Sequence, residues 1–524
     1  MVETKIRRSF FYEGKHLNEL LTYDDLKRLS EGTISASVNV IDGALEKANL
    51  LPTDIDMILL VGGSSQLPQV REKIEEKMGK QPLSIPKDLM LAVAKGAALY
   101  SKEISSLPMN RREKQILGNS LGVEVNDGGR RINKRLLNYD AELPATARYF
   151  LPLKEHQSEV LLNLVTLRGT SDNTEKKLQA RKIRLSKDAK EIAINIKVDE
   201  NRVITLEVFN PASPKETIAM QINKDILSDG DVDSIRKKYG ILPEKTNRVL
   251  TGEEPCIGID IGTTTSEMVY VYRTTKDMDN INNPDTPEKY NNYSFPSVVY
   301  FKDGRNDIQV ASKMADDALG DASLSGQVFS SFKIQDWNKI LGHIDNQNVT
   351  VQELTAHLIA KIWQTAKNDK LRLLNLKSAV ITIPAGFDSD QCQYLINAAK
   401  IAGIENVSLI DEPTAAFYYY KEKYSENLNG VKYVLVFDFG GGTTDVAILD
   451  VSSDTVLKEG YKDSIFKVLA TNSNLSCGGR NIDKSILNEI KKRFEDKNGV
   501  ILPDFVMNRI LRECENAKVV LASN

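Results

Sequence analysis

The chain has 524 residues, of which 41% are hydrophobic and 27% charged, so it can build several buried cores and lacks the composition of a disordered protein. Its 69 basic and 72 acidic side chains leave a net charge of −3, which argues against a general nucleic-acid or anionic-membrane binder. The four cysteines are far apart and the four histidines lack metal-pair spacing, so a disulfide framework, a cysteine–zinc site and histidine-driven catalysis are not expected.

The opening residues do not resemble a signal peptide and no apolar run approaches the ~20 residues of a membrane span, so we expect a cytoplasmic protein.

Apolar strands and amphipathic helices alternate through the first 104 residues. Residues 57–61 are predicted to form a strand that breaks at residues 62–65 (Gly-Gly-Ser-Ser) and enters a helix. Small residues between a strand and a helix allow close approach of a nucleoside, although this motif alone is weak evidence.

The hydrophobic period changes to two over residues 118–225. Residues 192–198 and 203–209 flank a polar turn and predict a hairpin, and residues 160–167 predict another strand. This block is therefore predicted to be all-β. The Pro-, Arg- and Ser-containing residues 105–117 before it are predicted to be a linker.

Mixed α/β patterning returns over residues 256–524, after a short helix predicted for residues 231–239 and a polar stretch. Thr350 and Glu353 predict the start of a long helix. An Asn- and Asp-rich segment between residues 274 and 293 is longer than most loops and is expected to be a surface insertion.

One motif occurs twice in this part of the chain. Residues 256–271 (CIGIDIGTTTSEMVYV) and 434–451 (VLVFDFGGGTTDVAILDV) both read as an apolar strand, an aspartate, a glycine turn with threonines and a second apolar strand. Such a hairpin tip exposes backbone N–H groups that can bind an anion. A single Gly-Thr turn could simply close a hairpin, but two copies in one chain argue against that explanation. We therefore interpret the two tips as binding one nucleoside triphosphate from two sides. The aspartates, Asp260 and Asp438, are expected to hold a hydrated Mg²⁺.

These motifs resemble those of the actin-like ATPases, and more specifically of the seventy-kilodalton heat-shock (DnaK-type) chaperones. The resemblance covers nearly the whole chain, but in a rotated order. The family's opening hairpin is residues 256–271, followed by AVITIPAGFDSDQ, LIDEPTAA, the second hairpin, CGGRNID and CENAK. The family's next segments, YEGKHLNELLTYDDLKRL, LVGGSSQLP and AVAKGAA, lie within residues 12–98. Joining Asn524 to Met1 would restore the family order, so the chain is interpreted as a circular permutant, which an exposed opening point can tolerate.

The resemblance implies an α/β plus β fold: a two-lobed, actin-like (ribonuclease H-like) ATPase domain and a β-sandwich substrate-binding domain. The expected boundaries are 1–104 for the C-terminal part of the ATPase domain, 105–117 for the interdomain linker, 118–225 for the sandwich, 226–255 for a short helix and connection, 256–430 for lobe I and 431–524 for the first part of lobe II.

Site residues also follow from the resemblance. Catalytic roles are implied for Lys333, Glu412, Asp438 and Thr443, and metal positioning for Asp260 and Asp438. The residues implied to bind ATP or ADP are Gly262, Thr263, Thr264, Gly440, Gly441, Gly442 and Thr443 around the phosphates, and Gly478, Gly479, Glu515, Lys518, Gly63 and Ser64 around the adenosine.

Several family residues are replaced here. Two arginines that pack on adenine in the family are Val519 and Gln66, and an arginine used with Pro384 to relay signals between domains is Cys392. The family's apolar linker and peptide-gripping loop are more polar here, and its helical lid is missing beyond Tyr239.

The sequence therefore favours a slow Mg²⁺-dependent ATPase and chaperone, hydrolysing ATP to ADP and phosphate and binding unfolded or extended polypeptide, with co-chaperones as further partners. The alternative is a nucleotide-sensing scaffold or docking protein with little hydrolysis and no conventional peptide clamp. A sugar kinase of the same superfamily is less favoured, because the DEPTAA and GGRNID segments resemble the chaperone branch.

Overall fold

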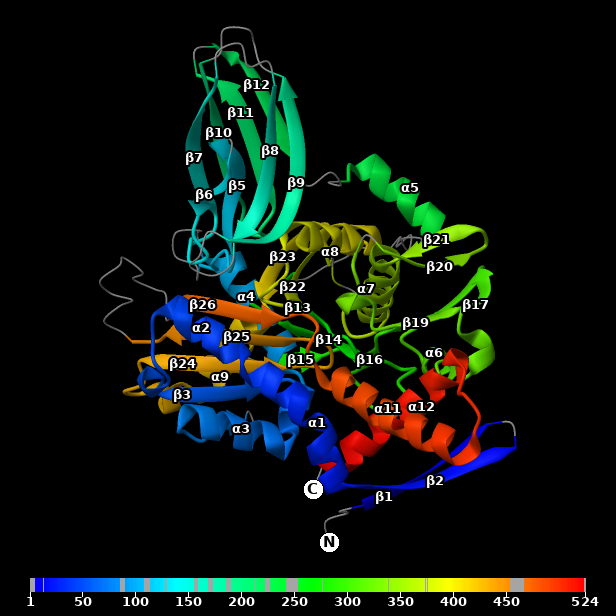
Figure 1. Ribbon diagram of the computed structural model, residues 1–524. Coiled ribbons are helices and arrows are strands. Elements are labelled where there is room, and N and C mark those ends of the chain that lie inside the picture. The colour runs from blue at the N-terminus through cyan, green and yellow to red at the C-terminus, as the bar shows by residue number, and fades with distance from the viewer. Residues whose placement is uncertain are drawn as a thin grey trace.

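The structure is a computed structural model. It describes residues 5–12, 14–84, 90–107, 114–127, 130–154, 159–167, 173–184, 190–211, 213–221, 227–241, 253–275, 277–337, 339–372, 374, 376–452 and 466–522. Within these residues the fold is mixed α/β, with two larger sheets that carry helices and a separate pair of antiparallel sheets (Figure 1).

The first of the larger sheets has five strands, in the order β26–β25–β24–β3–β4. Their bounds are Lys467–Asn474, Thr444–Asp450, Tyr433–Phe439, Met57–Val61 and Leu83–Ser84. The predicted strand at residues 57–61 is confirmed as β3. It pairs in parallel with β24, so this sheet joins segments from the two ends of the chain.

The second of the larger sheets has six strands, five of them in the order β15–β14–β13–β22–β23, with β16 paired to β14. The bounds are Met278–Asn280, Thr265–Val271, Cys256–Ile261, Ser378–Ile383, Asn406–Asp411 and, for β16, Phe295–Pro296. Strand β22 pairs in parallel with both β13 and β23. The same three-strand pattern, a hairpin beside a parallel strand, therefore recurs in both larger sheets.

Two helices pack between the larger sheets. They are α4 (Ala92–Ser106) and α9 (Glu412–Tyr424), and one buried cluster combines their side chains with residues of β3 and β24 on one side and of β22 and β23 on the other. These two helices therefore hold the facing sheets at a fixed separation.

Other helices cover the outer faces. The five-stranded sheet shares its core with α1 (Tyr23–Val38), α2 (Val40–Ala48), α3 (Pro68–Met78), α11 (Gly479–Asn498) and α12 (Asp504–Ala522). The six-stranded sheet shares its core with α7 (Val351–Asn368) and α8 (Ser389–Ala402). Between β16 and α7 the chain forms smaller elements: β17 (Val298–Arg305), β18 (Asp307–Val310), α6 (Lys313–Ala318), β19 (Val328–Ser330), β20 (Ile340–Ile344) and β21 (Gln347–Thr350). As predicted, the Thr350 hydroxyl accepts a hydrogen bond from Glu353 N at the start of α7.

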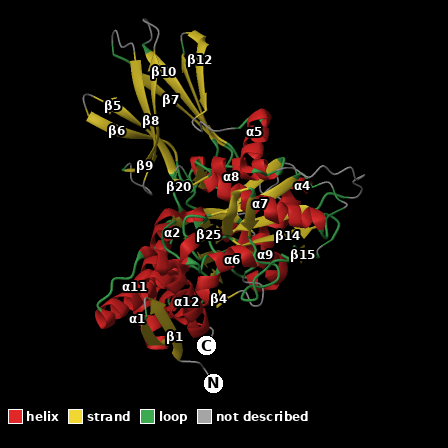
Figure 2. Cartoon of the chain, turned by 90° about the vertical axis from the view of Figure 1, so that its right-hand side faces the viewer, coloured by secondary structure: helices red, strands yellow, loops and turns green. Residues whose placement is uncertain are grey.

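A two-sheet unit of antiparallel strands projects from the body (Figures 1 and 2). Its sheets have the orders β12–β11–β10–β7 and β6–β5–β8–β9, and their apolar side chains share one core. The strands, from β5 to β12, span Ser120–Asp127, Arg130–Leu137, Ala145–Pro152, Glu159–Leu167, Thr174–Arg184, Glu191–Val198, Ile204–Asn210 and Ser213–Gln221. The predicted hairpin is β10–β11, the predicted strand at residues 160–167 is β8, and the predicted helix at 231–239 is α5 (Asp229–Tyr239).

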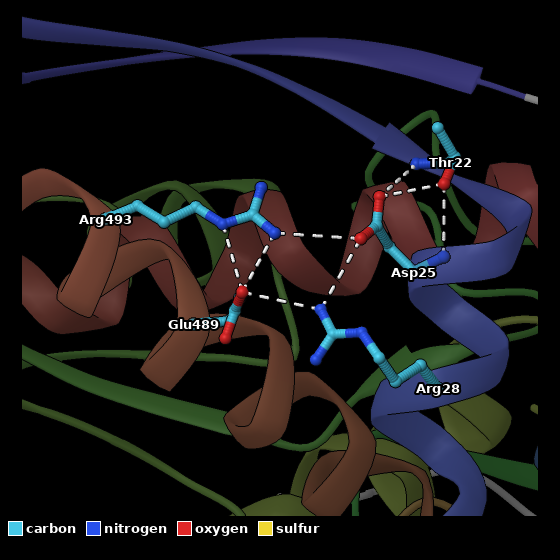
Figure 3. A network of polar contacts seen from close by, with 5 residues as sticks. All are labelled: Thr22, Asp25, Arg28, Glu489 and Arg493. Carbon is cyan, nitrogen blue, oxygen red and sulfur yellow. Dashed lines mark hydrogen bonds and ion pairs between the residues drawn. The ribbon is translucent and has the colours of Figure 1, made fainter.

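The two ends of the chain meet beside the five-stranded sheet. A hairpin of β1 (Lys5–Tyr12) and β2 (Lys15–Thr22) leads into α1, and β1 contacts α12. The Thr22 hydroxyl and the Asp25 carboxylate cap the start of α1, and Asp25 also lies 3.7 Å from Arg493 of α11 (Figure 3). On the neighbouring turn, Arg28 of α1 lies 3.4 Å from Glu489 of α11 (Figure 3). Ion pairs therefore link the first helix to a helix near the end of the chain.

One prediction needs correction. The segment between residues 274 and 293 is not a mere surface insertion, because it supplies β15 and buries Ile281 and Asn283. The Asn283 side chain donates hydrogen bonds to the carbonyl oxygens of Ser294 and Ala311, which fixes the segment against the sheet. Most of the polar stretch that was expected to form the connection before residue 255 lies outside the described residues.

The four cysteines are all buried and free. Among the described residues, every helix is too short or too polar to cross a membrane.

Candidate functional site

The two copies of the repeated motif form hairpins that meet tip to tip. Strands β13 and β14 form one hairpin and β24 and β25 the other. A Cβ on Gly441 would lie 2.7 Å from Thr264 Oγ1, and a Cβ on Gly442 would lie 2.5 Å from Thr263 Oγ1. A side chain at either position would displace these threonines, so Gly441 and Gly442 of the second tip are explained by the threonines of the first.

A cavity of about 390 Å³ opens beside the two tips, between the larger sheets. Most of the residues predicted from the sequence line it: Gly63, Ser64, Asp260, Gly262, Thr263, Thr264, Lys333, Glu412, Asp438, Gly440, Gly441, Thr443, Glu515 and Lys518. Gly442, Gly478 and Gly479 do not line the cavity. They lie behind its wall, where Gly479 N donates a hydrogen bond to Gly440 O, and where a Cβ on Gly478 would lie 2.5 Å from the backbone of Gly442.

The aspartates of the two hairpins stand at equivalent places. Asp260 is on β13 and accepts a 2.6 Å hydrogen bond from the Thr382 hydroxyl of the neighbouring strand. Asp438 is on β24, next to Gly62, whose backbone has φ +81° and where a Cβ would lie 2.3 Å from Asp438 Oδ1. Gly62 is therefore required both for its backbone conformation and for the space that Asp438 occupies.

Lys333 and Glu412 form a buried ion pair in the same cavity. Lys333 lies in a short 3₁₀ turn after β19, and Glu412 is the first residue of α9, where the helix dipole favours a negative charge. Burial alone would lower the pKa of Lys333, but the Glu412 and Asp260 carboxylates outweigh it and raise that pKa. Lys333 is therefore a buried, protonated lysine rather than a solvated surface residue.

The cavity holds more acidic groups than Lys333 can neutralise. Burial raises the pKa values of Asp260, Glu412 and Asp438. Burial likewise raises the pKa of Glu267 on β14 to about 8, with a further contribution from Asp260. An excess of buried carboxylates is the electrostatic environment that a divalent cation relieves. Within the described residues, no cluster of three or more His, Cys, Asp or Glu side chains is arranged to hold a metal ion directly. The two aspartates fit a hydrated Mg²⁺, which takes one or two carboxylates together with waters.

Glu267 was missed by sequence reasoning. In β14 it follows Thr265 and Ser266 directly and precedes the apolar run Met268–Val271, and it is only 2% exposed, so an acidic residue at the start of an apolar run was the available signal. Asp445 of β25 accepts 2.7 Å hydrogen bonds from Ala385 N and Ser473 Oγ. Its Oδ1 is therefore engaged by structural partners.

The far end of the cavity joins elements from the two ends of the chain. Ser64 Oγ donates a 2.9 Å hydrogen bond to Gly440 O, and Lys518 of α12 donates to Gly479 O at 3.1 Å. Lys518 also lies 2.8 Å from Asp483 of α11. The two residues whose family counterparts are arginines, Gln66 and Val519, line this end as well.

Residues of the segment that had been expected on the surface complete the cavity wall. Lys289, Tyr290 and Asn291 line the cavity, and Lys289 lies 3.0 Å from the buried Asp316 of α6. Arg512 of α12 also reaches Asp316, at 2.6 Å. These contacts connect the helices on the two sides of the cavity, which no local sequence pattern had indicated.

Comparison with known proteins agrees with this geometry. The sequence model of the family described as Hsp70 protein matches residues 2–248 and 256–524. The chain is 36% identical over 182 residues to the chaperone protein DnaK of Trieres chinensis, an alignment that covers 34% of this chain and 27% of that protein. It is 32% identical over 273 residues to the chaperone protein DnaK of Metamycoplasma hominis, covering 52% of this chain and 41% of that protein. The chain thus spans less than half the length of each of these relatives.

Proposed function

The chain belongs to the Hsp70 family, and on that premise we propose that it hydrolyses ATP with Mg²⁺ in the cavity between its two larger sheets. The observation that carries the proposal is the meeting of two Asp-Gly-Thr hairpin tips beside a buried lysine. Phosphoryl transfer to water needs little covalent work by the protein and depends on positioning and on positive charge around the phosphates.

The hairpin tips would bind the polyphosphate. Thr263 and Thr264 on one side, and Gly441 and Thr443 on the other, would direct backbone N–H groups and hydroxyls at phosphate oxygens. Gly262 and Gly440 would allow the phosphates close to the backbone, while their own N–H groups donate to Ser266 Oγ and Thr443 O within the tips. Gly442 would act from behind the cavity wall, through the close contact that it makes with Thr263.

Asp260 and Asp438 would hold the metal through water, and Mg²⁺ bound there would neutralise phosphate charge. The surplus of buried carboxylates supports this role, since burial raises the pKa values of both aspartates and a bound cation would stabilise their charged forms. Lys333 would place its positive charge at the terminal phosphate, and Glu412, its partner, would orient the attacking water.

The far end of the cavity would bind the adenosine. Gly63, Ser64, Glu515 and Lys518 line this end, and Gly478 and Gly479 support it from behind. The cross-links from Ser64 to Gly440 and from Lys518 to Gly479 would connect the adenosine end to the phosphate end.

We further propose that the larger sheets are the two lobes of an actin-like ATPase and that the two-sheet unit is a β-sandwich for extended polypeptide. A strand-like segment would bind by main-chain hydrogen bonds together with side-chain pockets. We propose chaperone activity for this chain by analogy with relatives named chaperone protein DnaK, of which it spans only a part.

The segment order supports a circular permutation. The family match falls in two blocks separated near residue 250, and β3 lies beside β24 although the two strands come from different blocks. The test is to join the present ends and open the chain near residue 250. A protein with an unchanged unfolding midpoint supports the permutation, whereas a chain that cannot fold contradicts it.

ATP turnover tests the activity. Phosphate release from ATP and Mg²⁺ would be measured for the natural chain, Asp438→Asn and the exposed control Asp496→Asn in α11. A group that holds a metal through water typically contributes about 10- to 100-fold to activity, so Asp438→Asn is expected to lose that much and the control nothing. Equal rates for Asp438→Asn and the natural chain would show that Asp438 does not hold the metal. Nucleotide-dependent thermal stabilisation without phosphate release would instead indicate a nucleotide-sensing scaffold.

A further inference from the structure

At the end of the cavity that we propose for adenosine, the two positions where the resemblance to the family implies arginines hold Gln66 and Val519. Neither residue supplies a guanidinium, the planar cation that packs well on an aromatic base. Ala522 lines the cavity three residues after Val519 on α12, and Met90 lines it where a Cβ on Gly63 would lie 3.4 Å from the Met90 sulfur. A base bound here would therefore meet apolar side chains and needs another flat surface to pack on.

Tyr290 is the one aromatic side chain among the described residues that line the cavity. Burial raises the pKa of its phenol, and the negative charges of Glu515 and Asp316 raise that pKa further. The effect of a charge falls off with distance, so the ring lies close to Glu515, a residue of the proposed adenosine end. Tyr290 is therefore a neutral aromatic group at the end of the cavity where the base would bind.

Polar contacts hold the Tyr290 ring in place. Its Oη donates a long hydrogen bond of 3.5 Å to Asp316 Oδ1, and Asp316 is only 1% exposed. Asp316 is held in turn by Arg512 of α12, at 2.6 Å, and by Lys289, at 3.0 Å. The Lys289 ammonium also lies 4.6 Å from the centroid of the Tyr290 ring, so it covers one face of the ring and leaves the other for a ligand. A group that is fixed in advance loses little freedom when a ligand packs on it.

We propose that Tyr290 supplies the aromatic surface on which the nucleobase packs, in place of the guanidinium groups that are missing here. This inference rests on the proposed function, because it assigns a residue to the base of the same nucleotide. An aromatic ring packs on the flat face of any base and does not read the hydrogen-bonding groups at the edge of the base. The ring should therefore contribute equally to the binding of adenine and guanine nucleotides, and nothing to the binding of a polyphosphate without a base.

The test is calorimetry on the full chain with Mg²⁺ and three ligands: ADP, GDP and inorganic triphosphate. The forms compared are the natural chain, Tyr290→Leu, Tyr290→Phe and Tyr272→Leu. Leucine removes the ring and keeps an apolar side chain, whereas phenylalanine keeps the ring and removes only the hydroxyl. Tyr272 is the matched control, because it is half-buried like Tyr290 but does not line the cavity.

Tyr290→Leu is expected to weaken the binding of both ADP and GDP about 5- to 100-fold, the usual contribution of a base packed on an aromatic ring, and to leave triphosphate binding within about twofold. Tyr290→Phe and Tyr272→Leu should bind all three ligands like the natural chain. Equal ADP affinity in Tyr290→Leu and the natural chain would overturn the proposal. An equal loss for triphosphate would also overturn it, and so would a loss in Tyr290→Phe as large as that in Tyr290→Leu, which would assign the effect to the hydroxyl.

Retained binding of triphosphate by Tyr290→Leu shows that the cavity is still folded. Tyr290→Trp is the second variant, because its larger ring should bind both nucleotides at least as tightly as the tyrosine does, a result that a damaged fold cannot produce. Weaker binding of both nucleotides by Tyr290→Trp would contradict the proposal. Failure of the proposed function gives a different result: a natural chain that binds neither ADP nor triphosphate removes both the function and this inference, whereas a natural chain that binds ADP leaves the variants to decide on Tyr290 alone.

Discussion

Gly96 in α4 lies directly against the backbone of α9: a Cβ at this position would be 1.6 Å from the carbonyl oxygen of Ala415. In the same helix, Ala94 and Ala98 face Gly258 of β13, where a Cβ would lie 2.3 Å from backbone atoms of both. The small residues of α4 therefore set how closely the two larger sheets approach each other, and this spacing determines the width of the cavity.

Gly96→Ala should destabilise the protein strongly. The added methyl group meets backbone atoms, which cannot turn aside as a flexible side chain can, so we expect a loss of about 3 kcal/mol in the free energy of unfolding, the upper end of the usual cost of overpacking. Gly32→Ala in α1 is the control, because a Cβ there has no neighbour within 4 Å and alanine favours a helix. Urea unfolding of both variants measures the difference in their free energies of unfolding. Equal midpoints for Gly96→Ala and Gly32→Ala would show that α4 and α9 can move apart without loss of stability.

Lys333→Met should abolish most ATP turnover and leave nucleotide binding measurable. The substitution keeps the length of the side chain but removes the charge that we assign to the terminal phosphate, and loss of one such group typically costs about 10²- to 10³-fold in rate. Phosphate release and calorimetry with ATP would separate the two effects. Lys339→Met, at an exposed position six residues along the chain, is the matched control. A rate within twofold of the natural chain in Lys333→Met would contradict the assigned role.

The hairpins and their tips were predictable because they are local. An aspartate, a glycine and threonines at fixed spacing between apolar strands define the motif, and its repetition indicated that the two tips meet. The placement of Lys333 could not be derived in this way, since its burial depends on Glu412, which lies far along the chain on another element. Glu267 and Tyr290 were missed for the same reason, because the facing sheet and the helices around it make them part of the cavity.

The surroundings of Cys392, which stands where the family has an arginine, also could not be predicted from neighbouring residues in the sequence. The replacement suggested a weaker connection between the two-sheet unit and the body. In the structure Arg202 supplies a guanidinium to the same neighbourhood from the other side of the contact. Burial raises the pKa of the Cys392 thiol, and the nearby Arg202 opposes that shift. A residue 190 positions away along the chain, at a turn whose conformation favours glycine, could not be paired with Cys392 from sequence spacing.

His357 should make the protein less stable in acid. It is buried in α7 between the rings of Tyr239 and Phe301, and burial, with a contribution from Arg305, lowers its pKa from 6.5 to about 3. The unfolded chain binds a proton on this residue below about pH 6.5 and the folded chain does not, so the free energy of unfolding falls as the pH drops from about 6.5 towards 3. The slope from this group is at most about 1.4 kcal/mol per pH unit, and above about pH 6.5 the contribution is constant.

Unfolding measured between about pH 7 and 4.5 checks this prediction. His357→Gln should flatten the dependence on pH, whereas His343→Gln, at an exposed position in β20, should leave it unchanged. Glu353, 4.0 Å from His357 Nε2, is already paired with Arg305 and so does not hold the imidazole in its charged form. A slope in His357→Gln equal to that of the natural chain would assign the acid sensitivity to other groups.

Val519→Arg should strengthen the binding of adenine nucleotides. Val519 lines the end of the cavity that we propose to bind adenosine and is 54% exposed, and the resemblance to the family implies an arginine packing on the base at this position. A guanidinium over an aromatic base at an exposed site contributes about 0.5–1 kcal/mol, so ADP should bind about two- to fivefold more tightly. Calorimetry with ADP measures this gain, and inorganic triphosphate, which has no base, should bind both forms equally. An equal gain with triphosphate would mean that the new charge attracts phosphate rather than packing on adenine, and the assignment of this end of the cavity to the base would then be wrong.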